Sequence, residues 1–504
     1  MSAYDSSTSA HVGLDPADWE DFRTEAHALL DHLLDHLRDA RERPVWRSVP
    51  ARTRERLRAP LPVAGQGLAA ALEDLRRDVL PYPYGTTHPR FWGWVNGSAL
   101  PIGVLADMAA TAMNSNVGAF DHSAVFVELQ VLDWLATMLG FEQPMDGLLT
   151  SGGSMANLLA IATAITARSG LEARRKGLAG GPQLTLYASL ETHTSVHKAV
   201  ELTGIGRDHL RLLPVDADYR VDLAALERTI ALDRAAGFRP LAIVGNAGTV
   251  STGATDDLNS LADLAEREEL WFHVDGAFGA LPWLVPEERG ALAGLQRADS
   301  ITFDLHKWLY LSNDVGCLLV RDRAALARTF ASRANYLTEL HGGLSAISDG
   351  CFKDKGIELT RRFRALKVWL ALKEHGADGF RAAIAANLAQ ARHLARLIDG
   401  TEGLERCAPA PLNVVCFRYR RPGLAFDALD RVNRELLVRL QERAVAVPSH
   451  TVLGGAFALR VAITNHRTRL EDVELLVRES VAIGDEILGE EQGARTGVIC
   501  GAKE

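Results

Sequence analysis

Between residues 147 and 320, short apolar runs alternate with segments of helical pattern. The runs are Leu148-Leu149, Leu184 to Tyr187, Leu241 to Val244, Leu270 to Val274, Ile301 to Phe303 and Cys317 to Val320. Buried strands separated by helices predict an α/β fold, with a mainly parallel sheet that is covered on both faces. Ligands of such sheets bind beyond the carboxyl ends of the strands. The residues that follow each run are therefore the candidate functional residues.

The flanking sequence differs from this central region, and a chain of 504 residues is expected to form more than one domain. Residues 18–41 and 67–79 have helical patterns with narrow apolar faces, which predicts an N-terminal helical arm within residues 1–100. Residues 101–372 form the predicted large α/β domain. Helical patterns and two short strand patterns predict a small C-terminal α+β domain over residues 373–504.

Composition limits the partners and the compartment. Lys and Arg number 55 against 64 Asp and Glu, and the sequence has no basic cluster, so we expect neither nucleic acid nor a membrane as a partner. No apolar run is long enough to span a bilayer, and the first residues do not resemble a signal peptide. Five scattered cysteines without a CxxC pair predict reduced thiols, no zinc site and a cytoplasmic location.

The run at Ile301 ends in Asp304-Leu305-His306-Lys307-Trp308. A lysine just past a buried strand must reach solvent, pair with an acid or lose its charge. A desolvated amine of lowered pKa is a nucleophile that condenses with aldehydes. Lys307 is therefore a candidate catalytic residue, and an ordinary lysine at a strand end is the alternative.

After Leu148-Leu149 the sequence continues Thr150-Ser151-Gly152-Gly153-Ser154-Met155-Ala156-Asn157 and then takes a helical pattern. Glycines at a helix start expose backbone N–H groups at its positive end, which is a site for a phosphate. The spacing matches neither a dinucleotide fingerprint nor a Walker motif, so a single phosphate is favoured. A simple tight turn is the alternative.

His193 and Asp275 follow two further runs. His193 is a candidate for stacking on a flat ligand, although a capping or surface histidine is the plainer interpretation. His193 and His197 are four residues apart, but no Glu of a zincin motif and no third ligand accompany them, so we predict no metal site. Asp275 precedes small residues and can point a carboxylate into a tight space, or merely cap a turn.

A phosphate site, a stacking imidazole, a carboxylate beside small residues and a buried lysine are together the parts that hold pyridoxal 5'-phosphate. The carboxylate has a specific task, because an anion beside the ring nitrogen keeps that nitrogen protonated. The combination of the four features predicts this cofactor more specifically than any one of them.

These residues resemble the group II pyridoxal-phosphate-dependent amino-acid decarboxylases, the family of aromatic-L-amino-acid, glutamate and histidine decarboxylases, from about Pro44 to Leu488. The resemblance implies fold type I, the aspartate aminotransferase-like fold, and a homodimer with active sites at the interface. It implies that Lys307 forms the Schiff base with the cofactor and that His193 stacks on the ring. The other cofactor-binding positions that it implies are Gly153, Ser154, Thr249, Asp275, Ala277 and His306.

Tyr336 matches the mobile-loop tyrosine that returns a proton to the substrate in family decarboxylases. With Lys307 and His193 it completes the implied catalytic set. Members that make aldehydes typically carry phenylalanine there, so Tyr336 favours simple decarboxylation. The substrate wall matches Trp92, Trp94, Asn116 and Phe120, although the two tryptophans can equally be core or interface residues.

Two positions depart from the family pattern. Asp304-Leu305 stands where Asn-Pro is common, and an anion there would repel a phosphate. Met155 stands where many bacterial relatives have Glu.

The expected reaction is decarboxylation of an L-amino acid, with an aromatic substrate favoured, to its amine and carbon dioxide. Three alternatives stay open: transamination or aldehyde formation on the same fold, a non-catalytic relative that binds the cofactor, and a metal enzyme that uses His193 and His197.

Overall fold

The computed structural model describes residues 13–332, 343, 344, 346 and 351–500, without the side chains of 171, 172 and 491–500. The chain divides into two compact units, residues 1–85 and residues 86–504. Each unit is described by itself. No helix within the described ranges combines the length and the apolar character needed to cross a membrane.

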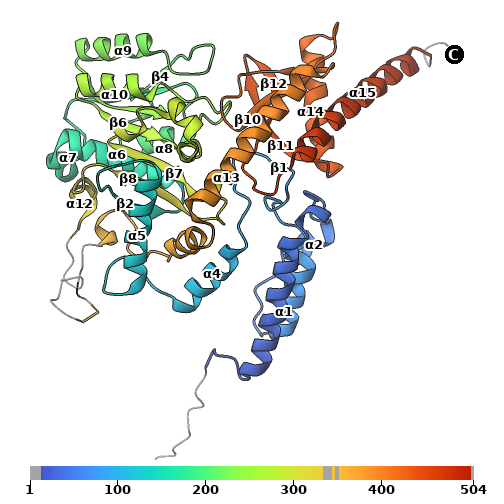
Figure 1. Ribbon diagram of the computed structural model, residues 1–504, viewed down its shortest axis with the longest axis horizontal. Coiled ribbons are helices and arrows are strands. Elements are labelled where there is room, and N and C mark those ends of the chain that lie inside the picture. The colour runs from blue at the N-terminus through green and yellow to red at the C-terminus, as the bar shows by residue number, and fades with distance from the viewer. Residues whose placement is uncertain (1–12, 333–342, 345, 347–350, 501–504) are drawn as a thin grey trace, which may run out of the picture. The chain divides into compact units, whose positions relative to one another are not determined.

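The first unit is helical (Figure 1). Its helices are α1 (Trp19–Arg38), α2 (Ala51–Arg56) and α3 (Leu68–Asp74). Asp18 caps α1, because its carboxylate accepts hydrogen bonds from the backbone N–H groups of Glu20 and Asp21 at 2.8 and 3.1 Å. No residue of α1 is buried, as expected for a helix with a narrow apolar face.

The large sheet of the second unit has seven strands in the order β2-β8-β7-β6-β5-β3-β4. The strands are β2 (Asp146–Thr150), β3 (Leu184–Ser189), β4 (Leu210–Leu213), β5 (Arg239–Asn246), β6 (Trp271–Asp275), β7 (Ser300–Asp304) and β8 (Gly316–Val320). From β4 through β3, β5 and β6 to β7 every neighbouring pair is parallel, while β8 runs antiparallel to β7 and β2. The predicted mainly parallel sheet is confirmed.

Helices cover both faces of this sheet (Figure 1), among them α6 (Gly153–Ser169) and α10 (Leu258–Arg267). The other helices of this part of the chain are α4 (Ile102–Met113), α5 (Ser123–Met138), α7 (Leu171–Lys176), α8 (Thr194–Leu202), α9 (Leu223–Ala235), α11 (Leu305–Trp308) and α12 (Ala325–Phe330). A Cβ on Gly245 of β5 would meet both Leu261 of α10 and Phe272 of β6, so Phe272 lies on the face that α10 covers. The next residue of β6, His273, bonds to Asn157 of α6. Since successive side chains of a strand point to opposite faces, α10 and α6 lie on opposite sides of the sheet.

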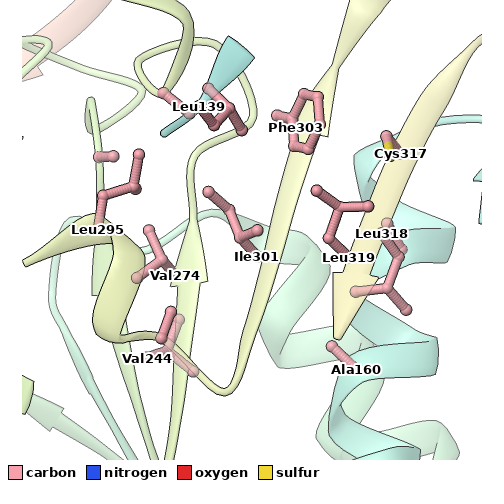
Figure 2. Packing of buried hydrophobic residues seen from close by; sticks show 14 of the residues in the cluster. Leu139, Ala160, Val244, Val274, Leu295, Ile301, Phe303, Cys317, Leu318 and Leu319 are labelled. Carbon is pink, nitrogen blue, oxygen red and sulfur yellow. The ribbon is translucent and has the colours of Figure 1, made fainter. Parts of the chain in front are cut away.

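The core lies between these layers. Figure 2 shows Val244, Val274, Ile301 and Leu319, which come from the adjacent strands β5 to β8, with Ala160 of α6. All five side chains are at most 2% exposed. This packing fixes the strands whose carboxyl ends carry the candidate residues.

A second sheet has five strands in the order β1-β11-β12-β10-β9. They are β1 (Phe91–Trp92), β9 (Leu404–Arg406), β10 (Val414–Tyr419), β11 (Val447–Leu453) and β12 (Ala456–Ala462), and the helices of this region are α13 (Ala365–Gly400), α14 (Phe426–Glu442) and α15 (Leu470–Cys500). These elements enclose a separate apolar cluster, the expected small α+β arrangement. The boundaries near residues 100 and 372 stay a prediction.

Candidate active site

Two cavities of about 260 and 320 Å³ lie at the carboxyl ends of β6 and β7. Four predicted residues line both cavities: His193, Asp275, Ala277 and Lys307. Asp275 ends β6, and Lys307 lies in the short helix α11 that follows β7. Because these two strands are parallel neighbours, residues that are 32 positions apart in sequence meet at one edge of the sheet.

Lys307 pairs with an acid. Its Nζ lies 2.8 Å from Oδ2 of Asp304, whose side chain is 3% exposed. Oδ1 of Asp304 is buried and has no hydrogen-bond partner in the described part of the chain. The acid that departs from the family pattern is therefore the counterion of the candidate catalytic lysine.

The predicted phosphate site lies at the start of α6. Gly152 has a φ of 155°, which favours glycine, and α6 begins at Gly153. A Cβ on Gly153 would come within 2.9 Å of Oδ2 of Asp304, so any side chain there would fill the space beside the helix N-terminus. Gly152, Gly153 and Ser154 line the 320 Å³ cavity together with His306. His306 donates from Nδ1 to the carbonyl oxygen of Val315 at 2.8 Å, and burial lowers its pKa.

Asp275 is held by two donors. Its Oδ2 accepts from Nδ2 of Asn157 at 2.8 Å, and its Oδ1 accepts from the backbone N–H of Ala277 at 3.1 Å. Ala277 presents only a methyl group beside the carboxylate. This leaves room for a flat ring, as the small residues after Asp275 predict.

His193 caps α8. Its Nδ1 accepts from the backbone N–H of Ser195 at 3.2 Å, and burial lowers its pKa despite the opposing effect of Asp275. The capping role and a place in the cavity wall therefore coexist at this residue.

The 260 Å³ cavity also contains a buried cation. Arg460 of β12 is 3% exposed, and it donates to the carbonyl oxygens of Ser251 and Trp94 at 3.2 and 2.9 Å. Its Nη2 is buried without a hydrogen-bond partner among the described residues. Burial lowers the pKa of Arg460 to about 10, so it remains cationic at neutral pH. Thr249 lines the same cavity, but its Oγ1 accepts from Ala254 N at 3.1 Å.

The four predicted substrate residues do not lie together: of Trp92, Trp94, Asn116 and Phe120, Trp94 alone lines one of the two cavities. Trp94 lines the 260 Å³ cavity and is 53% exposed. Trp92 instead packs in the core of the small domain and donates from Nε1 to Thr468 at 3.1 Å. Asn116 accepts from the backbone N–H of Arg361 at 2.9 Å, and neither it nor Phe120 lines the two cavities. Tyr336 lies outside the described residues.

Sequence reasoning gave no role to several residues of this site: Asn157, Ser195, His273 and Arg460. Asn157 is a strongly polar residue on the mostly apolar buried face of α6, which is a signal that could have been read. Arg460 likewise interrupts an apolar strand that is buried from Phe457 onward.

These residues fit pyridoxal phosphate. A glycine-lined helix N-terminus suits its phosphate, a primary amine suits its aldehyde, and a fixed carboxylate beside a methyl-bearing residue suits its ring nitrogen. Both cavities reach Lys307 and share His193, Asp275 and Ala277 with it.

Comparison with known proteins agrees with this site. The family described as "Pyridoxal-dependent decarboxylase conserved domain" matches residues 50–420. The chain is 33% identical over 472 residues to an aromatic-L-amino-acid decarboxylase of Bacillus atrophaeus, covering 93% of this chain and 96% of that protein. It is 32% identical over 474 residues to tryptophan decarboxylase 1 of Oryza sativa subsp. japonica, covering 89% and 90%.

The fold agrees as well. A crystal structure of Oryza sativa TDC with PLP and tryptamine superposes with a TM-score of 0.86 at 29% identity, covering 94% of this chain and all of that one. Mouse CSAD superposes with a TM-score of 0.84 at 28% identity, covering 92% and 99%. The chain therefore belongs to the pyridoxal-dependent decarboxylase family, whose enzymes use pyridoxal phosphate to decarboxylate amino acids.

Proposed function

We propose that this enzyme converts an aromatic L-amino acid into its amine and carbon dioxide, with pyridoxal phosphate attached to Lys307. The observation that carries the proposal is the position of Lys307, which lines both cavities together with His193 and Asp275. When bound, the cofactor supplies a protonated ring that withdraws electrons from the Cα–carboxylate bond.

Residues of the chain would hold the phosphate and the ring of the cofactor. Gly153 and Ser154 would hold the phosphate, His306 would close that end of the site, and Asp275 would keep the ring nitrogen protonated. His193 would cover the flat face of the ring, and its pKa, lowered by burial, keeps it neutral there. Thr249 contributes to the wall beside the substrate.

We assign the 260 Å³ cavity to the substrate, and its lining favours an aromatic amino acid. Apolar side chains line much of it, among them Trp94, Val95, Val250 and Phe278. Arg460 lines the same cavity, and its guanidinium supplies a positive charge for an α-carboxylate there. Several relatives are named as aromatic-L-amino-acid, tryptophan or tyrosine decarboxylases, which agrees with such a pocket.

Aldehyde formation is the second candidate reaction, because a relative that is 30% identical over 470 residues is the phenylacetaldehyde synthase of Petunia hybrida. Tyr336 favours the amine. A tyrosine hydroxyl can return a proton to Cα, whereas phenylalanine cannot.

We also propose that the enzyme is a cytoplasmic homodimer. Asn116 and Phe120 do not line the cavities of their own chain, and a site shared between subunits would give them a place in the substrate wall. Light scattering on the purified enzyme measures the oligomeric state directly.

The reaction is tested by incubating the enzyme and pyridoxal phosphate in air with each of the twenty common L-amino acids and identifying products by mass spectrometry. An amine from an aromatic amino acid supports the proposal, and an amine from another class only would overturn the substrate assignment. Tyr336→Phe should divert turnover toward aldehyde. Unchanged amine output from that variant would remove Tyr336 from the mechanism.

A further inference from the structure

A chain of hydrogen bonds runs from the wall of the 320 Å³ cavity into the interior, and Asn157 is its centre. Asn157 lies on α6, one turn after Gly153, and is 1% exposed. It contacts three polar side chains from two other elements: Asp275 and His273 of β6, and Ser195 of α8. A buried amide that bonds to all three connects the carboxylate of the site to His273, which lines neither cavity.

The contacts of Asn157 fix the orientation of its amide. Nδ2 lies 2.8 Å from Oδ2 of Asp275 and 2.8 Å from Oγ of Ser195, while Oδ1 lies 2.9 Å from Nε2 of His273. A carboxylate oxygen accepts hydrogen bonds, so the NH₂ group must face Asp275. The amide oxygen therefore faces His273 and can only accept from it.

This orientation places the proton of His273. Its Nε2 must carry the hydrogen, so its Nδ1 accepts from the hydroxyl of Ser300 at 2.8 Å. The Ser300 oxygen in turn accepts from Nε1 of Trp271 at 2.8 Å. Burial lowers the pKa of His273 to about 4, so the ring is neutral at pH 7, and both of its nitrogens are used.

The same reasoning places the proton of His193. Ser195 Oγ accepts from Asn157, so its own hydrogen is free to point at Nδ1 of His193, 2.7 Å away. The backbone N–H of Ser195 also points at that nitrogen. Nδ1 of His193 is thus an acceptor, and the neutral ring carries its hydrogen on Nε2.

We propose that His273 and Asn157 are positioning residues that together orient the carboxylate of Asp275 toward the cofactor ring and set the proton position on His193. The proposal rests on the role given to Asp275 above. His273 does not line either cavity, so its influence must pass through Asn157.

The hydrogen bonds run in one direction, because His273 donates to Asn157 and Asn157 donates to Asp275. Without the Nε2–H of His273, the buried oxygen of Asn157 loses its donor, and of the three contacts only those to Asp275 and Ser195 remain. A buried acceptor without a donor is costly, so the amide shifts toward another donor and holds the carboxylate less firmly. Asp275 is then less well placed to bond to a ring nitrogen.

The test compares the dissociation constants of pyridoxal phosphate and of its analogue with a CH group in place of the ring nitrogen. Wild-type enzyme should bind the natural cofactor more tightly than the analogue, and Asp275→Asn should abolish that preference. His273→Leu should reduce the preference by about tenfold, because it weakens the hold of Asn157 on the charged carboxylate of Asp275. His273→Gln, whose amide can still donate to Asn157, should retain most of it.

Thr163→Val is the matched control. Thr163 is a fully buried polar residue of the same helix, and within the described ranges its hydroxyl bonds to the carbonyl oxygen of Leu159 alone, at 2.7 Å. It should keep the wild-type preference. Far-ultraviolet circular dichroism of each variant confirms folding, and if His273→Leu does not fold, Asn157→Ser replaces it with the same expected loss.

Equal weakening of both ligands in His273→Leu, or an unchanged preference, would overturn the proposal and leave His273 a structural residue. This experiment measures the affinity for the cofactor and its analogue, not turnover. A failure of the decarboxylation proposal would instead appear in the products of wild-type enzyme, so the failure of one proposal can be told from the failure of the other.

Discussion

Lys307 places its Nζ 2.8 Å from Oδ2 of Asp304, three residues before it in the chain. The second oxygen of the acid has no partner in the described residues. To attack an aldehyde, the amine of Lys307 must leave this ion pair.

Asp304→Asn should accelerate the attachment of pyridoxal phosphate several-fold, because the amine of Lys307 no longer has to leave an ion pair with a buried acid. Stopped-flow absorbance after mixing apoenzyme with cofactor measures the rate. Asp146→Asn, which breaks the pair with Lys355 (2.6 Å), is the control and should leave the rate unchanged. A slower attachment in Asp304→Asn would show that the acid assists the reaction.

Arg460→Met should raise the KM for the amino acid by about tenfold or more, because a buried charged hydrogen bond to the carboxylate is lost. The product amine has no carboxylate, so its inhibition constant should change little. Arg460→Lys keeps the charge and should lie between wild type and Arg460→Met. Equal weakening of amino acid and amine would mean that Arg460 only supports the cavity wall through Ser251 and Trp94.

Arg361 and Glu128 form a buried ion pair with side chains that are 1% and 0% exposed, at 2.5 Å. Glu128→Leu should lower the free energy of unfolding by about 3–5 kcal/mol, because it leaves a buried guanidinium without its counterion. The double variant Glu128→Leu/Arg361→Met should recover much of this loss. Urea denaturation measures both, and Asp322→Asn, in an exposed pair with Arg328, should cost at most about 1 kcal/mol. A double variant less stable than the single one would contradict this account.

Much of the site follows from local sequence. Asp275 is the last residue of β6, and Lys307 and Gly153 each lie three residues after a strand. The parallel order of β6 and β7 follows from the alternation of strands and helices. Distant contacts could not be predicted in this way. Asn157 and His273 are 116 positions apart, and only the packing of α6 on β6 brings them together. Trp92 was ambiguous because an aromatic residue suits a core and a pocket equally.

Some strands were also missed for a physical reason. β4 lies at the edge of its sheet and is buried only at its ends, and β11 contains the polar run Ser449-His450-Thr451. Neither shows the continuous apolar run by which the central strands were predicted.

Buried neutral histidines predict how stability depends on pH. Burial lowers the pKa of His273 to about 4 and that of His466 to about 3, from an ordinary value of 6.5. Below pH 6.5 the unfolded chain therefore binds protons that the folded chain excludes, and stability falls as the pH decreases toward 4. Each histidine contributes a slope of about 1.4 kcal/mol per pH unit in that range. His466→Gln should show a shallower fall of the thermal midpoint, and a slope equal to that of wild type would exclude this contribution.

The most direct test of the account is the identity of the residue that holds the cofactor. Borohydride reduction of the cofactor-loaded enzyme, followed by proteolysis and mass spectrometry, should find the reduced pyridoxal phosphate on Lys307. Lys307→Ala should lose both the label and the visible absorption while retaining its fold. A label on another lysine in wild type, or a retained visible band in Lys307→Ala, would contradict the assignment of this site.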